Sequence, residues 1–396
     1  MLRYLICLGL VVGLDSDQAY KFSSSIPLFS WLVVVAGPDH LEDIRKASDE
    51  QISFLGALDL TTQFDYTISP KLKGDLAHVR VVRGAMTRNI GTRYDDVLDE
   101  IDKILGTLLV GADKDWVLIP VYSSVTQIVS RYTSCFFVGP ELSSNQHFTD
   151  IMEEYASHVA KDGAVLSRLP NWLKPLVSRI QFDTKGKIRE IEGYLRPVLE
   201  KRLEKGTLEH PDADSNDMIT WLWNAVNETN RSLNDIAIRL IWINIASIRT
   251  TSSLLSHVLI NLATYTSYIE PLRKEISAIV EAEGWSKSSI ERMRKLDSFV
   301  KESQRVHGSS AVMVRRLAMK DFTFSDGSVI PKGTTFAVAG GEINNDERYY
   351  SNPEEFQGFR FADMDSLKWQ MTPTAVTQCI QHLLFKGLLD ISDTLV

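Results

Sequence analysis

The chain has 396 residues, of which 44% are hydrophobic and 24% are charged, with 22 glycines and 13 prolines. This composition is typical of globular proteins and excludes collagen-like, mucin-like and low-complexity disordered chains. The formal net charge of −8 argues against a nucleic-acid-binding protein, which gathers Lys and Arg on one face. The three cysteines, Cys7, Cys135 and Cys379, are too widely spaced to predict a disulfide framework or a paired-cysteine metal site, which favours a reducing compartment or a cytosol-facing domain.

The N-terminal segment carries an unbroken run of apolar residues and glycine over residues 5–14. Ten helical residues rise about 15 Å, half of the hydrocarbon core of a bilayer, so this run is too short to span one. Three interpretations stay open: a signal peptide behind Arg3 that no A-x-A-like cleavage site follows, a clipped membrane anchor, and a buried N-terminal strand.

The first elements after this segment are two adjacent strands. They are expected in KFSSSIPLFS (21–30) and in WLVVVA (31–36), where β-branched residues precede a Gly-Pro turn. A helix follows, with Asp39 as its expected N-cap. The sequence from about 89 to 205 is mainly helical by its periodicity, with a break at Gly-Pro 139–140.

The clearest predicted element is a helix over residues 232–265, which contain no glycine or proline. Ser232 can cap it, and its apolar residues recur at helical spacing on more than one face. At 1.5 Å per residue this helix is a rod of about 50 Å that would cross the middle of a domain. It is not a membrane span, because Arg239, Arg249 and His257 interrupt it.

Helices are expected to continue over 270–283 and 287–307, after which the pattern changes to short alternating strands. Turn signals stand at 325–327 and 331–333. The order is a small β piece, a long helical body and a second β piece. It predicts one mainly α domain with small β-sheets, in which distant parts of the chain meet in a sheet.

Glu-x-x-Arg, whose two residues share a helix face, is the first candidate motif. The chain has five copies: Glu42–Arg45, Glu228–Arg231, Glu270–Arg273, Glu291–Arg294 and Glu302–Arg305. Most such pairs are solvated and contribute little to stability. The last copy stands apart, because it closes a helix and is followed by Arg316 before the second β piece and by Arg360 in FQGFRF.

This ordered set resembles the cytochrome P450 haem-thiolate monooxygenases, in particular their fungal microsomal branch. The segments RKASDEQISF, RYTSCFFVG, LPNWLKPLVSRI, IPKGTTFAVA and DERYYSNPEEFQGFRF carry the resemblance, which covers about residues 20–371. It implies the mainly helical, triangular P450 fold, truncated at both ends. The implied organisation is a clipped anchor or leader remnant at 1–20, a P450-like domain at 21–371 and a divergent tail at 372–396.

The resemblance also assigns roles to charged residues. It implies that Glu302, Arg305 and Arg360 form a buried charge network that holds the helix to the loop under the haem. Such a network is structural, and a third charged partner limits its desolvation penalty. Arg316 is implied to pair with a haem propionate, whereas the residues alone allow an exposed charge at a strand end.

Residues 246–251 of the long helix match the family's central-helix pattern, in which a threonine helps deliver protons to iron-bound oxygen. Thr250 holds that position, but Arg249 replaces the usual acid and Ser247 the usual glycine. An arginine stays charged and cannot relay a proton as a carboxylate does. Without the resemblance, the commoner expectation for Thr250 is a hydrogen bond to its own helix carbonyls.

The family's haem-ligand loop, Phe-x-x-Gly-x-x-x-Cys-x-Gly, has no match in this sequence. Its cysteine thiolate is the axial iron ligand of a P450. Cys379 is the only cysteine after the long helix, and Thr372, Ala375 and Gln381 stand where the motif has Phe, Gly and Gly. We therefore assign no metal ligand, and we expect a divergent or mis-spliced C-terminal tail.

Two hypotheses of function follow. By resemblance, the chain is a haem monooxygenase that hydroxylates a lipophilic small molecule with O2, takes electrons from NADPH through a partner reductase and lies on the cytosolic face of the endoplasmic reticulum membrane. However, because the haem-ligand loop has no match in its sequence, this chain is expected to be inactive. The alternative is a non-catalytic remnant or pseudoenzyme of the same fold. An unrelated α-rich binding protein would require the ordered motifs to be coincidental.

Overall fold

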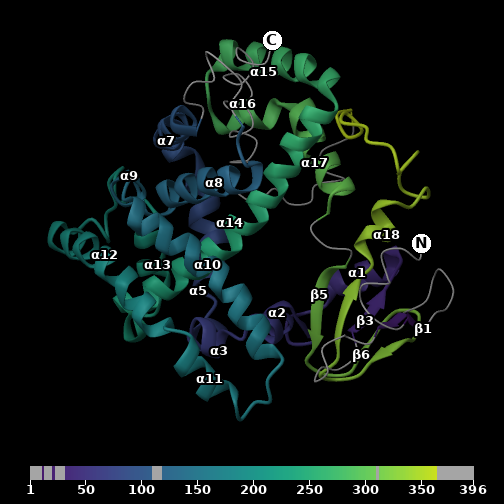
Figure 1. Cartoon of the computed structure of the whole chain (residues 1–396), viewed down its shortest axis with the longest axis horizontal. Helices are drawn as coiled ribbons and strands as arrows, with labels where there is room; N and C mark the ends of the chain where they lie inside the picture. The colour runs from purple at the N-terminus through teal and green to yellow at the C-terminus, as the bar shows by residue number, and fades with distance from the viewer. Residues whose placement is uncertain (1–10, 13–19, 23–31, 109–117, 309–311, 364–396) are drawn as a thin grey trace. The chain divides into compact units, whose positions relative to one another are not determined.

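The computed structural model describes residues 11–12, 20–22, 32–108, 118–308 and 312–363 (Figure 1). The chain divides into two compact units. The first comprises residues 1–73, 159–183 and 308–356, and the second comprises 74–158, 184–307 and 357–396. The described residues are mainly helical with two small sheets, which confirms the predicted fold class.

The first unit holds both sheets. Its strands are β1 (Val11–Val12), β2 (Tyr20–Phe22), β3 (Leu32–Val35), β4 (Ile52–Ser53), β5 (Met313–Ala318), β6 (Phe322–Thr323), β7 (Val329–Ile330) and β8 (Thr335–Val338). Its helices are α1 (Pro38–Lys46), α2 (Phe54–Thr62), α3 (Phe64–Thr67), α4 (Lys71–Gly74, ending at the boundary), α11 (Lys174–Gln181) and α18 (Gly340–Asn344). The six-stranded sheet has the order β1-β2-β3-β8-β5-β4, and β6 and β7 form a hairpin.

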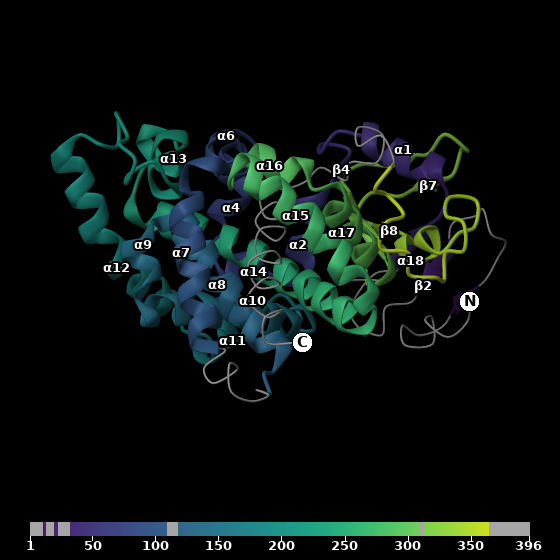
Figure 2. The ribbon, with the colours of Figure 1, turned by 90° about the horizontal axis from the view of Figure 1, so that it is seen from above.

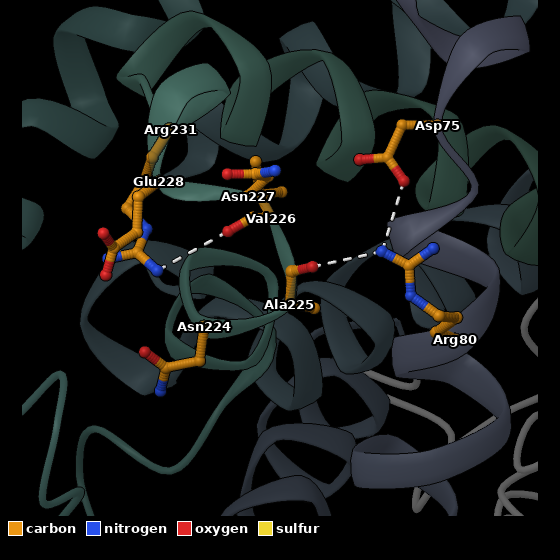
Figure 3. Close-up of a pocket in the computed structure, with 8 residues that line it drawn as sticks. All are labelled: Asp75, Arg80, Asn224, Ala225, Val226, Asn227, Glu228 and Arg231. Carbon is orange, nitrogen blue, oxygen red and sulfur yellow. Dashed lines mark hydrogen bonds and ion pairs between the residues drawn. The ribbon is translucent and has the colours of Figure 1, made fainter.

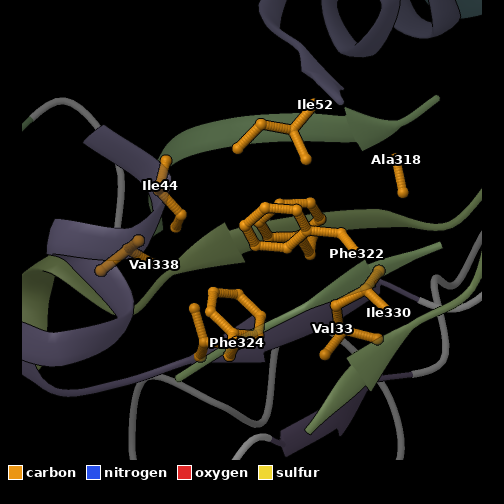
Figure 4. Packing of buried hydrophobic residues seen from close by; sticks show 10 residues of the cluster. Val33, Ile44, Ile52, Ala318, Phe322, Phe324, Ile330 and Val338 are labelled. Carbon is orange, nitrogen blue, oxygen red and sulfur yellow. The ribbon is translucent and has the colours of Figure 1, made fainter. Parts of the chain in front are cut away.

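The sheet joins the two β-rich parts of the sequence. β3 pairs in parallel with β8, so that Val33 lies opposite Phe336, and every other pairing is antiparallel. Figure 4 shows the buried cluster on this sheet, in which the ring of Phe324 packs edge-on to Phe322 at 5.1 Å and to Phe336 at 5.9 Å between centroids. Burial of these apolar side chains is what fixes the register, because a one-residue slip would turn them to the other face.

Two of the sequence predictions concern this unit's first strands and helix. The strand expected in 31–36 is present as β3, and Val11–Val12 pair with Phe22 and Lys21, while the rest of 1–14 lies outside the described residues. The prediction of Asp39 as N-cap was wrong: the helix begins at Pro38, after Gly37 with φ 99°. Proline is favoured at the first helical position because its fixed φ fits the helix. The N–H that proline lacks would also have no helical partner at this position.

Gly163 belongs to the part of helix α10 (Gln146–Ser167) that lies in the first unit, where it packs on α2 of the same unit. A Cβ on Gly163 would lie 2.6 Å from the carbonyl oxygen of Thr61 and 2.8 Å from Cα of Thr62. We therefore expect Gly163→Ala to lower the free energy of unfolding by about 1–3 kcal/mol, the usual range for overpacking. The control is Gly193→Ala in α12 (Thr184–Lys205), where a Cβ meets nothing within 4 Å. It should raise stability by about 0.5–1 kcal/mol in the same denaturant titration, and equal effects of the two substitutions would contradict the packing.

The second unit is helical. It contains α5 (Ala77–Val81), the π-helical turn η2 (Val82–Met86), α6 (Thr87–Asn89), η3 (Ile90–Arg93), α7 (Tyr94–Leu108), α8 (Val121–Val138), α9 (Pro140–Ser143), most of α10, α12, α13 (Met218–Ala225), η4 (Glu228–Asn230), α14 (Leu233–Thr264), η5 (Thr266–Tyr268), α15 (Ile269–Glu283), α16 (Lys287–Arg292) and α17 (Arg294–Val306). α8 packs on both α7 and α14 (Figure 2).

α14 confirms the long helix predicted from the sequence. The Ser232 side chain caps it by accepting a hydrogen bond from the Asp235 backbone N–H at 3.2 Å, and the helix then runs for 32 residues. Most of its first half is buried, as the apolar residues on several faces predict. In the part of the chain that the structure describes, no helix combines the length and the apolar character that crossing a bilayer requires.

The helix expected over 287–307 is broken into α16 and α17 at Met293. The break has a local cause in the Glu275 carboxylate of α15, which accepts hydrogen bonds from the backbone N–H groups of Lys295 (2.9 Å) and Leu296 (3.1 Å). These amides lack helical partners at the start of α17, so a carboxylate there stabilises a new helix N-terminus.

Candidate functional site

The Glu302 carboxylate is the centre of a buried charge cluster in the second unit. Arg305, one turn on in α17, donates two hydrogen bonds to it, each of 2.8 Å. Arg360 donates from Nε to both carboxylate oxygens at 3.1 Å, and the Gln357 backbone N–H donates to Oε1 at 2.9 Å. The side chain of Glu302 is 0% exposed, and those of the two arginines are 3% and 5% exposed. The structure thus brings together the three charged residues that the sequence singled out.

Neutral side chains of α17 and η5 hold the same segment, and the sequence analysis missed them. The Ser298 hydroxyl donates to the Gly358 carbonyl and accepts from the Phe361 N–H, both at 2.9 Å. The Tyr268 hydroxyl accepts from the Gly358 N–H at 3.1 Å. A Cβ on Gly358 would lie 2.7 Å from Phe299, so only glycine allows this approach. No spacing rule reveals such contacts, because their partners are backbone groups.

Thr250 and Arg249 both lie on the exposed part of α14. The Thr250 hydroxyl donates to the carbonyl of Ala246 at 2.8 Å, the bond that a mid-helix threonine usually makes. The next residue, Thr251, is only 1% exposed, and its Oγ1 has no hydrogen-bond partner within the described ranges. Ser247 is also buried, but its hydroxyl donates to the Ile243 carbonyl at 2.8 Å, so the buried hydroxyl without a described partner in residues 246–251 is that of Thr251, a position that the sequence analysis did not select.

Arg316 lies in β5 of the first unit, beside a β-bulge between Met313 and Arg316 that contains Val314 at φ 53°. Its half-buried guanidinium donates to the Arg315 carbonyl at 2.9 Å and lies 5.5 Å from the centre of the Phe54 ring. Burial lowers the pKa of Arg316. No carboxylate among the described residues forms an ion pair with it, so this guanidinium is suited to an anionic group such as a haem propionate.

The iron of a haem-thiolate enzyme requires a thiolate, and the described residues do not supply one. Their only cysteine, Cys135, is fully buried in α8, hydrogen-bonded to the carbonyl of Asp96 at 3.7 Å, and burial raises its pKa to about 11. Within the described ranges no three His, Cys, Asp or Glu side chains gather as metal ligands would. Cys379 lies outside the described residues. Among the described residues, Arg316 is thus a suitable partner for a haem carboxylate, whereas none of them supplies the thiolate that the iron requires.

An open cavity of about 550 Å³ in the second unit is lined by polar groups that bond to one another (Figure 3). The Arg80 guanidinium donates to Asp75 and to the Ala225 carbonyl, each at 3.2 Å. Asp75 also accepts from Arg239 of α14 at 3.0 Å, and Arg231 lies 5.4 Å from the centre of the Trp223 ring. None of the residues that the sequence singled out for the haem site lines this cavity.

Arg239, which donates to Asp75 of this cavity, is the centre of a buried polar cluster. It is 2% exposed, donates to Asp235 at 2.7 Å, and donates to Nδ1 of His78 at 3.2 Å. Since Arg239 can only donate, Nδ1 of His78 accepts and the neutral ring carries its proton on Nε2. Burial, followed by the Arg239 charge, lowers the pKa of His78 from 6.5 to about 4.

This lowered pKa predicts a pH dependence of stability. Between about pH 6.5 and 4 the unfolded chain binds a proton that the folded chain does not, so stability falls as the pH falls through this window. His78 contributes about 3 kcal/mol to this loss of stability. We expect His78→Gln, which can still accept from Arg239, to lose this part of the slope in denaturation curves at several pH values. The control His210→Gln removes an exposed histidine and should keep the slope; an unchanged slope in the His78 variant would contradict the prediction.

Comparisons with known proteins agree with this geometry. The family model for cytochrome P450 matches residues 32–373. Cytochrome P450 monooxygenase 71 of Postia placenta is 37% identical over 353 residues, covering 87% of this chain and 71% of the relative. Ent-kaurene oxidase P450-4 of Gibberella fujikuroi is 28% identical over 375 residues, covering 92% and 73%. The structure of retinoic acid-bound cyanobacterial CYP120A1 aligns with a TM-score of 0.64 at 18% identity, covering 94% of this chain and 83% of that one, which shows the shared fold. The chain therefore belongs to the cytochrome P450 family.

Proposed function

We propose that this chain has the framework of a fungal P450 monooxygenase that acts on a lipophilic small molecule. The observation that carries the proposal is the extent of the family match, 342 residues from 32 to 373. A haem, when bound, supplies the oxygen-activating chemistry. O2 is reduced with two electrons from NADPH, which a partner reductase transfers, so that one oxygen atom enters the substrate and the other leaves as water. The name of the Gibberella fujikuroi relative, an ent-kaurene oxidase, supports a terpenoid as the first substrate class to test.

Residue roles within this proposal rest on position. Arg316 would hold a haem propionate, because its half-buried guanidinium has no carboxylate partner among the described residues. Glu302 and its two arginines would hold the segment that leads to the ligand loop. Thr250 is proposed for proton delivery beside Arg249, with the buried hydroxyl of Thr251 as a further candidate. We place the P450 domain at residues 21–371, after a leader or anchor remnant at 1–20 and before a divergent tail at 372–396. We also propose that the protein lies on the cytosolic face of the endoplasmic reticulum membrane.

We further propose that these 396 residues do not hold a thiolate-ligated haem. The family match ends at residue 373, six residues before Cys379. Thr372, Ala375 and Gln381 replace the residues whose backbone would approach the sulfur. A cysteine without such a surrounding is a small apolar residue rather than a tuned ligand. The second candidate function, a non-catalytic remnant or pseudoenzyme, follows from the same observation.

The framework proposal is tested with a chimera. Residues 1–371 are joined to the C-terminal part of Postia placenta monooxygenase 71, beginning with its Cys loop. With haem, NADPH and a fungal reductase, the chimera is expected to convert a member of a terpenoid panel to a product heavier by one oxygen atom. A chimera in which the loop's Cys is replaced by Ser is the matched control. A folded chimera that takes up haem but oxidises no lipophilic compound would contradict the proposed substrate class, and one that takes up no haem would contradict the framework.

The origin of the tail has its own test. The genomic sequence downstream of codon 371 is read in all three frames. A Phe- and Gly-rich Cys loop in another frame or behind an intron would assign the tail to a splicing or frame error. Absence of such a loop, together with a transcript that encodes residues 372–396, would favour the remnant.

A further inference from the structure

A second cavity, of about 230 Å³, is lined by residues of α7, α8 and α10 in the second unit. Figures 1 and 2 show these three helices but not the cavity. None of the residues assigned above to the haem or to the charge cluster lines it. Its apolar wall comes from the side chains of Ile104 and Leu108 at the end of α7. The cavity is large enough for a small organic molecule.

Glu153 of α10 is the most unusual residue of this wall. It is half-buried, and within the described ranges it forms no hydrogen bond or ion pair. Its neighbour Glu154, in contrast, is exposed and paired with Lys187 at 3.0 Å. Burial, together with the nearby charge of Asp150, raises the pKa of Glu153. A partly desolvated carboxylate without a partner is costly, so a bound cation would stabilise it.

A second, independent observation comes from α8. Ser130 lines the cavity and is 1% exposed, and its Oγ finds no hydrogen-bond partner in the described part of the chain. Buried hydroxyls are nearly always hydrogen-bonded, so an unpartnered one at a cavity wall points to a bound group. A hydroxyl oxygen can accept from a ligand N–H.

The charges of the lining residues indicate whether the bound group is a cation or an anion. Arg131 is the only cation among the lining residues, and its guanidinium is paired with Glu100, which is 1% exposed, at 2.5 Å, while its Nε has no hydrogen-bond partner among the described residues. Asp150 accepts a hydrogen bond at 2.7 Å from the amide of Gln146, a neutral group that does not balance a carboxylate. Glu153 and Asp150 therefore leave the cavity negative, which disfavours anions and favours cations.

We propose that this cavity binds a small alkylammonium ion. The ammonium group donates hydrogen bonds to the Glu153 carboxylate and to Oγ of Ser130, and the alkyl chain packs against Ile104 and Leu108. Three N–H donors on a compact head suit a carboxylate and a hydroxyl on neighbouring helices. The site needs no haem, so its test is independent of the proposed function.

The test is isothermal titration of the full chain with n-butylammonium chloride at pH 8, with n-butanol as the neutral ligand of nearly the same shape. Saturable binding of the ammonium ion is expected, with butanol at least about tenfold weaker, since a hydrogen bond to a charged group is lost. Glu153→Gln should weaken ammonium binding by about tenfold or more, and Ser130→Ala by a few-fold. Glu204→Gln removes an exposed carboxylate of α12 and should leave the affinity unchanged.

Affinity should also fall as the pH is lowered, since protonation of Glu153, whose pKa is raised by burial, removes the counter-ion. Asp150→Asn, at an exposed position, supplies a second charge variant if Glu153→Gln does not fold, and it should weaken binding less than tenfold but measurably. Absence of saturable ammonium binding by the unaltered chain, or equal affinity for butanol, would overturn the site. So would a folded Glu153→Gln chain that binds as well as the original.

Discussion

Glu302→Gln is expected to lower the free energy of unfolding by about 3–5 kcal/mol, because it leaves the guanidinium groups of Arg305 and Arg360 buried beside a neutral amide. The substitution keeps the volume of the side chain, so the loss reports the charge rather than a cavity. Glu302 accepts from both arginines and from the Gln357 N–H. This carboxylate is therefore one of the groups that attach a segment more than fifty residues away in the sequence to α17.

The matched control is Glu270→Gln in α15, another of the five Glu-x-x-Arg copies and in the same unit. Its side chain is 63% exposed and forms an ion pair with Lys274 at 3.4 Å, so screening by water leaves little stability to lose. Both variants are compared with the original chain by denaturant titration with circular dichroism. Hydrogen exchange of the Gly358 and Phe361 amides reports the attachment itself, and should rise only in the Glu302 variant. Equal, small losses of stability in the two variants would show that the cluster does not hold the segment.

Burial explains why one copy of the motif differs from the others. The sequence contains five equivalent spacings, and spacing alone gives each the same weak pairing. In the structure Glu42 and Arg45 form the same two-bond contact, at 2.6 and 2.7 Å, on an exposed helix face. Only at Glu302 does tertiary packing remove water from the pair. In the sequence, the context of this copy at the end of a helix, followed by Arg316 and Arg360, separated it from the others, whereas the local pattern did not.

The elements that could be predicted from the sequence are those with strong local signals. α14 combines a capping serine, helical periodicity and the absence of helix breakers, and its bounds differ from the prediction by one residue at each end. The break at Met293 was missed because its cause, the Glu275 carboxylate, comes from a different helix. Asp39 was taken for a cap, although Pro38 beside it marks the first helical position.

The site residues follow the same division. Thr250 was selected from its position in a family pattern, and no periodicity could tell it from Thr251, which is the buried one. Ser298 and Tyr268 bind backbone groups of residues 358–361, and such contacts leave no mark in residue types. Arg316 lies beside a β-bulge in its strand, and no pattern in the sequence predicts this bulge.

The second large effect is expected in the visible spectrum. The purified 396-residue chain, supplied with haem, reduced and treated with carbon monoxide, should not develop the strongly red-shifted band of a thiolate-ligated iron. Cys379 lacks the surrounding residues that tune such a ligand, and burial keeps Cys135 protonated, with a pKa of about 11. The chimera that carries a complete Cys loop is the positive control, because it differs only after residue 371.

The most direct measurement is therefore this carbon monoxide spectrum, recorded side by side for the original chain, for Cys379→Ser and for the chimera. The account predicts a red-shifted band in the chimera alone. A red-shifted band in the original chain that disappears in Cys379→Ser would contradict it, and would show that the C-terminal segment supplies an iron ligand without the family's loop.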